Sequence, residues 1–217
     1  MTLIKYCFFD LDGTIVDSSR GIINSINYAL RKMDLPLFEA HETKDFIGPP
    51  LAAAFCRTRG LCEADGQRAL AYYRENYRAG GIFECDVYDG IRSLLDALQK
   101  ANVTCVLATC KPYEFAEQIL AYHGLDGYFS FVSGPEMNGT RGEKDEVIAY
   151  AVEQLKIEDV TSVLMIGDRA GDVLGAKKNG IGCAGVLWGF GSEAELMDAG
   201  AVTLCAQPLD VMKTLEI

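Results

Sequence analysis

Beyond residue 100, short apolar runs alternate with stretches that have helical spacing. Each run has the length of a buried strand, and each helical stretch carries apolar residues three or four positions apart. Such alternation is typical of a parallel β-sheet covered by helices. The sequence therefore predicts a Rossmann-like α/β core with helices on both faces of the sheet. The expected strands are 103–108, 128–132, 162–166, 183–187 and 202–204, and the expected helices are 113–123, 144–155, 172–179 and 193–199.

The first expected strand, residues 4–9, stands apart from the others. A strand-helix-strand unit needs only about 30 residues, and far more chain than that separates this run from the next one at Val103. The intervening segment has few strand-like runs. We therefore expect an α-helical subdomain over residues 16–83, inserted into a core made of residues 1–15 and 84–217. The helices expected in the insertion are 21–33, 50–59 and 66–78.

Composition excludes several classes of function. The chain has 217 residues, 49% of them hydrophobic, which suffices for one substantial core or one core and a smaller domain. Its net charge is −11 and its basic residues are scattered, so binding to a nucleic-acid polymer is not expected. It shows neither an export signal nor an apolar run of about 18 residues. The sequence therefore predicts a cytoplasmic protein with no membrane partner, and we expect most of its eight cysteines to be reduced.

Acidic residues follow two of the expected strands at the point where each strand ends. Asp10 and Asp12 come directly after the first strand, and Asp168 and Asp172 follow the run 162–166. Ligands of parallel α/β folds bind beyond the carboxyl ends of the strands, so we expect these side chains on one rim. Two like charges at ~4 Å and an effective dielectric of ~20 cost roughly 4 kcal/mol. A bound cation, a shared proton or solvent would relieve that repulsion, and the cation is the option that supports chemistry.

Each candidate residue also has an ordinary structural interpretation. The sequence from Asp10 to Thr14 is a favourable polar turn. Asp168 and Asp172 suit the first turn of a helix. Thr109, directly after the run 103–108, is a typical helix N-cap residue, and lysines such as Lys144 are usually exposed. These alternatives stay open for each residue alone, whereas the combination favours a site.

The ordered set of motifs resembles the haloacid dehalogenase superfamily. The resemblance rests on Asp10-x-Asp12-Gly-Thr, then Thr109, Lys144 and Gly167-Asp168-x-x-x-Asp172, and it spans nearly the whole chain. The presence of two aspartates in the first motif resembles the phosphotransferase branch of this superfamily. A helical insertion between the first and second motifs is similar to the cap of the phosphoglycolate-phosphatase-like and 5'-nucleotidase-like group.

The resemblance implies a phosphatase with four catalytic residues. Asp10 would be the nucleophile and would form an aspartyl-phosphate. Asp12 would protonate the leaving alkoxide and then accept a proton from the hydrolytic water. Thr109 and Lys144 would bind the oxygens of the transferring phosphoryl group, where negative charge accumulates.

The same resemblance implies Mg²⁺ as the cofactor, because a hard cation binds both carboxylate and phosphate oxygens. It assigns the side chains of Asp10 and Asp168 and the carbonyl of Asp12 to that ion. Asp172 would support the ion through water or a hydrogen bond. These four residues are the expected metal site.

The expected substrate is a small phosphate monoester, similar to phosphoglycolate or a nucleoside 5'-phosphate. The inserted helices would act as a lid over it, and the candidate substrate-binding residues are Gly48, Cys110, Lys111 and Arg141. A sugar phosphomutase like β-phosphoglucomutase remains an alternative. So does a regulatory protein that binds ligands on this fold without catalysis. Either a monomer or a homodimer is expected.

Overall fold

The computed structural model describes residues 3–39, 46 and 51–215 and divides into two compact units. One unit comprises Met1–Asp17 and Val87–Ile217, and the other comprises Ser18–Asp86. The expected insertion of a helical subdomain into an α/β core is therefore confirmed. The predicted domain boundaries at 15/16 and 83/84 stay a prediction, and the compact units divide two or three residues later along the chain.

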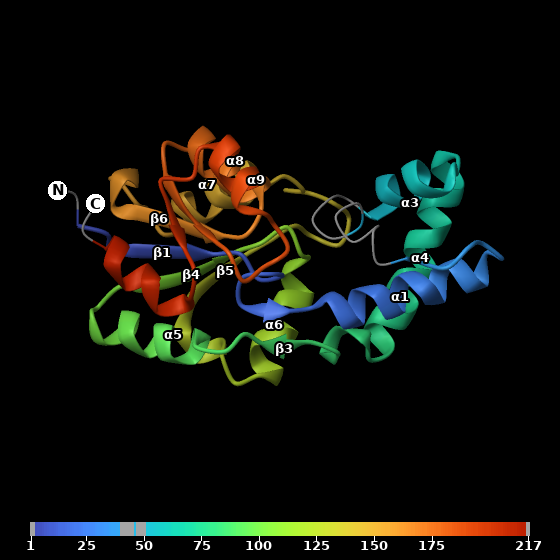
Figure 1. The fold of residues 1–217 in the computed structure, drawn as a ribbon, viewed down its shortest axis with the longest axis horizontal. Coiled ribbons are helices and arrows are strands. Elements are labelled where there is room, and N and C mark those ends of the chain that lie inside the picture. Colours follow the sequence, from blue (N-terminus) through green and yellow to red (C-terminus); the bar gives the residue numbers. More distant parts are fainter. Residues whose placement is uncertain (1–2, 40–45, 47–50, 216–217) are drawn as a thin grey trace. The chain divides into compact units, whose positions relative to one another are not determined.

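A six-stranded parallel sheet forms the centre of the larger unit (Figure 1). Its strand order is β5-β4-β1-β6-β7-β8, so the first strand lies between β4 and β6. In register, Phe9 at the end of β1 lies beside Leu107 and Ile166. All six expected strands are present. They are β1 (Tyr6–Phe9), β4 (Thr104–Ala108), β5 (Phe129–Ser133), β6 (Val163–Gly167), β7 (Gly182–Val186) and β8 (Thr203–Cys205).

Helices cover both faces of this sheet, as the sequence predicts (Figure 1). Helices α7, α8 and α9 lie on one face, and α5 and α6 lie on the other. Their bounds are α5 (Ile91–Lys100), α6 (Tyr113–Tyr122), α7 (Lys144–Gln154), α8 (Ala170–Lys178) and α9 (Glu193–Ala199). Short 3₁₀ helices connect them at Asp126–Tyr128 and Val160–Ser162, and another lies near the C-terminus at Pro208–Thr214.

The core explains why each strand of the sheet is a continuous apolar run in the sequence. Phe8, Val106 and Met165 on three adjacent strands belong to one buried cluster, which also contains Val147 of α7 and Val173 of α8. Neighbouring residues along each strand point to the opposite face and are also buried. A parallel sheet covered on both faces has no solvated side, so its strands lack polar alternation.

Helix α5 was not among the expected helices. Four of its residues, Ile91, Leu94, Leu95 and Leu98, are completely buried, and their spacing follows one face of a helix. The preceding Gly90 has a φ of 88°, a left-handed conformation that suits glycine immediately before the helix. The periodicity needed to predict this helix was therefore present in the sequence.

The smaller unit is helical. It contains α1 (Ser19–Lys32), α3 (Leu51–Arg59), α4 (Glu63–Ala79) and the 3₁₀ helix Gly81–Phe83, and α4 packs against both α1 and α3. The three helices expected here are present, although Pro50 lies outside the described residues. Two short strands that were not expected, β2 (Val16–Asp17) and β3 (Asp86–Val87), pair where the chain enters and leaves this unit.

Two general expectations can be compared with the structure. All eight cysteines are free, and five of them are buried. Among the described residues, no helix combines the length and the apolar character needed to cross a membrane.

Candidate active site

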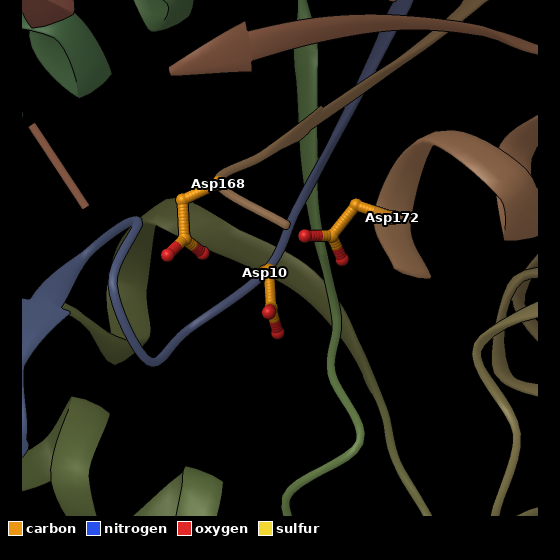
Figure 2. Close-up of side chains that lie close together, drawn as sticks. All are labelled: Asp10, Asp168 and Asp172. Carbon is orange, nitrogen blue, oxygen red and sulfur yellow. The ribbon is translucent and has the colours of Figure 1, made fainter. Parts of the chain in front are cut away.

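Three aspartates that follow two adjacent strands along the chain meet at the carboxyl edge of the sheet (Figure 2). Asp10 follows β1, Asp168 follows β6, and Asp172 lies in the first turn of α8. One carboxylate oxygen from each of the three lies within 4.8 Å of the others. Asp168 and Asp172 are almost completely buried, and the side chain of Asp10 is 13% exposed. Parallel pairing of β1 with β6 therefore creates an acidic cluster from residues far apart in the sequence.

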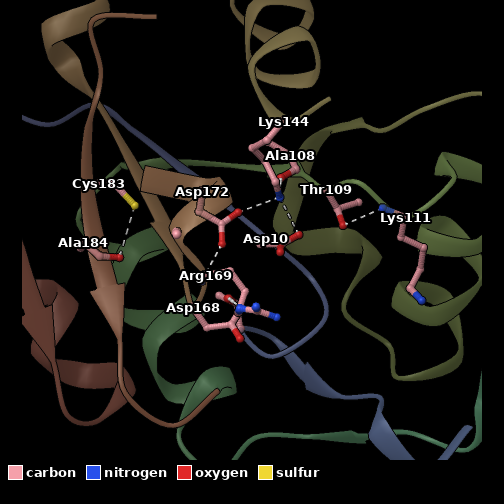
Figure 3. A network of polar contacts seen from close by, with 12 residues as sticks. Asp10, Ala108, Thr109, Lys111, Lys144, Asp168, Arg169, Asp172, Cys183 and Ala184 are labelled. Carbon is pink, nitrogen blue, oxygen red and sulfur yellow. Dashed lines mark hydrogen bonds and ion pairs between the residues drawn. The ribbon is translucent and has the colours of Figure 1, made fainter. Parts of the chain in front are cut away.

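Lys144 contacts this cluster directly through its ammonium group (Figure 3). Its Nζ atom lies 2.9 Å from Asp10 Oδ1 and 2.8 Å from Asp172 Oδ1, and it donates a hydrogen bond to the carbonyl of Ala108 at 3.0 Å. The side chain is only 8% exposed, unlike a typical surface lysine. Lys144 is the first residue of α7, and the Glu143 capping box fixes the start of that helix.

Burial and charge shift the pKa values of the cluster. Burial raises the pKa of Asp168 to about 8, assisted by the negative charges of Asp172 and Asp10. Burial also raises the pKa of Asp172 to about 6, although Lys144 opposes this shift. Burial acts to lower the pKa of Lys144, but Asp10 and Asp172 outweigh it and raise that pKa well above its ordinary value.

The cluster fits a divalent metal ion. Lys144 supplies one positive charge beside three carboxylates, so it cannot balance them alone when all three are ionised. The available ligands are oxygens, which hard cations such as Mg²⁺ prefer. Asp10, Asp168 and Asp172 are therefore chemically suited to hold such an ion.

Asp172 combines two of the roles considered for it. Its Oδ2 atom accepts a hydrogen bond from the Arg169 amide at 3.0 Å, which caps α8, while its Oδ1 atom contacts Lys144. Gly167 makes this placement possible because a Cβ atom there would lie 2.3 Å from Asp172 Cγ. The capping and the electrostatic interpretations of Asp172 are thus compatible.

Asp12 is held by a different lysine. Its Oδ2 atom lies 3.0 Å from Lys111 Nζ, and the two side chains are 20% and 6% exposed. Lys111 was a candidate for substrate binding, and the structure places its ammonium on the second aspartate of the first motif. The adjacent Gly13 has a φ of 82°, and its amide donates to the carbonyl of Val16, the first residue of β2, at 2.9 Å.

Thr109 and Cys110 follow β4 at the same edge. Thr109 is 1% exposed, and its Oγ1 atom accepts a hydrogen bond from the Lys111 amide at 3.2 Å (Figure 3). It does not cap α6, whose N-cap residue is Pro112. Cys110 is exposed. The threonine hydroxyl therefore organises the loop from which Lys111 reaches Asp12.

Two further residues, Gly48 and Arg141, were expected to bind the substrate. Gly48 lies outside the described residues. Arg141 lines a separate hollow of about 600 Å³, where its guanidinium carbon is 4.1 Å from the centre of the Tyr150 ring and its Nη2 atom is 3.4 Å from Glu136 Oε1. None of the site aspartates lines that hollow.

The sequence prediction missed the loop that follows β7. Trp188 and Phe190 lie beside the first motif and Asp168, where Trp188 Nε1 donates to the carbonyl of Thr14 at 3.0 Å and the Phe190 amide donates to Asp168 Oδ2 at 2.8 Å. Trp188 directly follows the expected strand 183–187 and precedes Gly189, and this position was the signal available in the sequence.

Comparisons with known proteins agree with this geometry. A 5'-nucleotidase of Pseudomonas aeruginosa is 39% identical over 208 residues, which cover 96% of this chain and 94% of that protein. The tyrosine-protein kinase PtkA of Mycobacterium tuberculosis is 37% identical over 196 residues, covering 90% of this chain and 66% of that protein. A crystal structure of a predicted phosphatase from Clostridium acetobutylicum superposes with a TM-score of 0.93 at 40% identity and covers 100% of both chains. The family model described as haloacid dehalogenase-like hydrolase matches residues 7–186, and the chain therefore belongs to that family.

Proposed function

We propose that this hydrolase is a Mg²⁺-dependent phosphatase that cleaves a small phosphate monoester through an aspartyl-phosphate. The observation that carries the proposal is the placement of Asp10. Its carboxylate is partly accessible, contacts Lys144, and lies beside the buried carboxylates of Asp168 and Asp172. A nucleophile held by a cation next to a metal site is the arrangement that phosphoryl transfer requires.

Asp10 performs the first step. One of its carboxylate oxygens attacks phosphorus, a bond forms between that oxygen and phosphorus, and the bond to the leaving alkoxide breaks. The ion pair with Lys144 restricts the orientation of that carboxylate. Lys144 also neutralises negative charge on the phosphoryl oxygens during the transfer.

Asp12 acts as the general acid and then as the general base. It protonates the leaving oxygen in the first step and accepts a proton from water in the second, as that water attacks phosphorus and releases phosphate from Asp10. The 3.0 Å contact with Lys111 holds the Asp12 side chain in one place. Lys111 therefore acts on the reaction through Asp12.

The loop after β4 binds the phosphoryl group. Thr109 is buried at the same edge of the sheet as Asp10, and its hydroxyl proton is available because Oγ1 serves as the acceptor in its bond to Lys111. The hydroxyl donates to a phosphoryl oxygen. A hydrogen-bond donor fixed in this position stabilises the negative charge that develops in the transition state.

The acidic cluster would hold Mg²⁺. When bound, the ion offsets the repulsion between carboxylates and phosphate and polarises the phosphoryl group. Asp10 and Asp168 would supply carboxylate oxygens and Asp12 its carbonyl, and Asp172 would support the site through its bond to Lys144. The closeness of three carboxylate oxygens and the unbalanced buried charge support this assignment.

The substrate class follows from the relatives. The Pseudomonas aeruginosa relative is named a 5'-nucleotidase, so nucleoside 5'-monophosphates are the first class to test, followed by phosphoglycolate and sugar phosphates. Residues 16–83 are proposed to act as the lid that selects among them. Gly48, Cys110 and Arg141 stay candidates for substrate contact.

Transfer to an acceptor other than water is the second candidate function. One relative is named a tyrosine-protein kinase, and its similarity extends over 90% of this chain. The Asp10 chemistry would be the same in a phosphomutase or a kinase, and only the acceptor in the second step would differ. Phosphate release must therefore be measured together with phosphate transfer.

A phosphate-release screen tests the proposal. Purified protein is incubated with nucleoside 5'-monophosphates, phosphoglycolate and sugar phosphates, with Mg²⁺ or with EDTA. We expect release that requires Mg²⁺ and that falls on the order of 10³-fold or more in Asp10→Asn. Asp198→Asn, at an exposed position of α9, is the matched control.

Two results would overturn it. Release by Asp10→Asn at the wild-type rate, with deamidation excluded by mass spectrometry, would remove Asp10 as the nucleophile. Label from a ³²P-substrate that appears in a sugar phosphate or a tyrosine peptide, with no free phosphate, would assign the chain to the transferases.

A further inference from the structure

We propose that Thr14 and the loop from Trp188 to Gly191 form a positioning element that fixes the orientation of Asp168 for metal binding. The inference rests on the proposed function, because it assigns these residues a task at the Mg²⁺ site. The element joins three strands, since Thr14 follows β1, Asp168 follows β6, and the loop follows β7.

Both carboxylate oxygens of Asp168 have a donor in this element. Thr14 Oγ1 donates to Asp168 Oδ1 at 3.3 Å, and the Phe190 amide donates to Asp168 Oδ2 at 2.8 Å. Thr14 and Asp168 are completely buried. Two donors on opposite oxygens restrict rotation of the carboxylate about its terminal bond, and each oxygen keeps lone pairs for a cation.

Glycines allow the loop to approach Asp168 closely. A Cβ atom on Gly189 would lie 2.4 Å from Asp168 Cβ and 2.3 Å from the Gly13 carbonyl oxygen. A Cβ atom on Gly191 would lie 1.8 Å from the Asp168 carbonyl oxygen, and one on Gly13 would lie 2.2 Å from Asp168 Oδ2. These separations are below any real Cβ contact, so three glycines are needed to surround one aspartate.

Trp188 links the loop to the first motif. Its Nε1 atom donates to the Thr14 carbonyl oxygen at 3.0 Å, and the ring is partly buried. Thr14 is therefore held through its carbonyl by Trp188, while its hydroxyl holds Asp168. A displacement of the tryptophan would move the donor on which one Asp168 oxygen depends.

The expected consequence is a metal site that is ordered before the ion arrives. Residues that hydrogen-bond to metal ligands typically contribute about 10- to 100-fold to metal affinity or activity. Thr14 and Trp188 do not touch the reacting atoms in this scheme. They act through Asp168, so their removal weakens binding of the ion without removing a ligand.

Mn²⁺ binding without substrate tests the inference. Free Mn²⁺ is measured by electron paramagnetic resonance in titrations of wild type, Asp168→Asn, Thr14→Val, Thr14→Ser and Trp188→Phe. Thr14→Val preserves shape and loses the hydroxyl, whereas Thr14→Ser keeps it. We expect Thr14→Val to raise the Mn²⁺ dissociation constant about 10-fold, Thr14→Ser to restore it to within about threefold, and Trp188→Phe to fall between these two.

Thermal unfolding in EDTA separates positioning from simple stability. Thr203→Val, on β8 and away from the element, is the matched control for loss of a threonine hydroxyl. A Thr14→Val protein that unfolds within a few degrees of wild type in EDTA and still binds Mn²⁺ poorly supports the inference. Should Thr14→Val not fold, the same comparison is made with Trp188→Phe.

The outcomes also separate this inference from the proposed function. If wild type and Asp168→Asn bind Mn²⁺ equally or not at all, the metal site itself is wrong. If wild type binds Mn²⁺ and Asp168→Asn does not, while Thr14→Val and Trp188→Phe bind like wild type, only the positioning element is overturned. Failure of Thr14→Ser to restore affinity would also overturn it.

Discussion

The ammonium of Lys144 lies 2.8 Å from Asp172 Oδ1, and the two side chains are 8% and 1% exposed. Neither charge is compensated by bulk water. Removing one partner of a buried pair costs about 3–5 kcal/mol because the other charge stays buried. This relationship makes Lys144 as important for folding as for the proposed reaction.

Lys144→Met should therefore lower both stability and activity. We expect a loss of roughly 3–5 kcal/mol in the free energy of unfolding, measured in urea at neutral pH, and a fall in kcat of at least about 10²-fold at saturating Mg²⁺. Lys177→Met, at an exposed position on α8, is the matched control and should change neither quantity. A fully active and stable Lys144→Met would contradict the role of this lysine.

Two glycines of α8 should respond oppositely to alanine. A Cβ atom on Gly175 would lie 2.7 Å from Lys144 Cγ and 3.1 Å from the Asp145 amide, whereas one on Gly171 would meet nothing within 4 Å. We expect Gly175→Ala to lose about 1–3 kcal/mol by forcing α7 and α8 apart. Gly171→Ala should be neutral or gain up to about 1 kcal/mol from helix propensity. Urea unfolding of the pair measures both effects, and equal stabilities would contradict the tight packing at Gly175.

Removal of metal should make stability fall as pH rises. The folded-state pKa is about 8 for Asp168 and about 6 for Asp172, whereas an unfolded aspartate has a pKa of about 3.9. Between pH 4 and pH 8, in the range of these values, the folded state binds more protons than the unfolded state, so the free energy of unfolding decreases with pH.

Thermal unfolding in EDTA across this pH range provides the measurement. Mg²⁺ at pH 8 should restore the lost stability, because it binds the ionised carboxylates of the folded state. Asp168→Asn in EDTA should show a shallower dependence on pH. A wild-type melting temperature in EDTA that is constant or rises across this interval would contradict the assigned shifts.

Lys111→Met should lower kcat more than it raises KM. The lysine contacts Asp12, which serves as the proposed acid and base, so its loss impairs proton transfer. A residue that bound the substrate directly would mainly change KM. Lys178→Met, which removes an exposed lysine paired with Asp145, is the control. Steady-state kinetics that show an unchanged kcat and a raised KM would favour the original interpretation of Lys111 as a substrate ligand.

The α/β core was predictable because its signals are local and strong. Continuous apolar runs such as Val163–Gly167 mark strands buried on both faces, and the polar residues directly after them mark the ligand edge. Helix α5 was overlooked although Ile91 and Leu98 lie on its buried face. Strands β2 and β3 are two residues long, too short to give a periodic pattern.

The partners of the site residues were less predictable than the residues themselves. Asp10, Asp168 and Asp172 could be grouped from strand order and the family motif, yet the contact of Lys111 with Asp12 depends on a loop conformation that side-chain chemistry alone does not determine. The donation from Phe190 to Asp168 uses a backbone amide, which every residue except proline carries. Such contacts leave no signature in residue identity.

The pairing of β2 with β3 has a consequence for how proteins of this architecture diversify. The chain leaves the α/β core along β2 and returns along β3, which pairs with it. The helical unit is therefore one continuous insertion into the core. An insertion of this kind can be exchanged, lengthened or shortened during evolution without shifting the register of β1 against β4 and β6. Under the proposed function, a change in this one segment of the gene would alter substrate choice while Asp10, Asp168 and Asp172 are inherited unchanged.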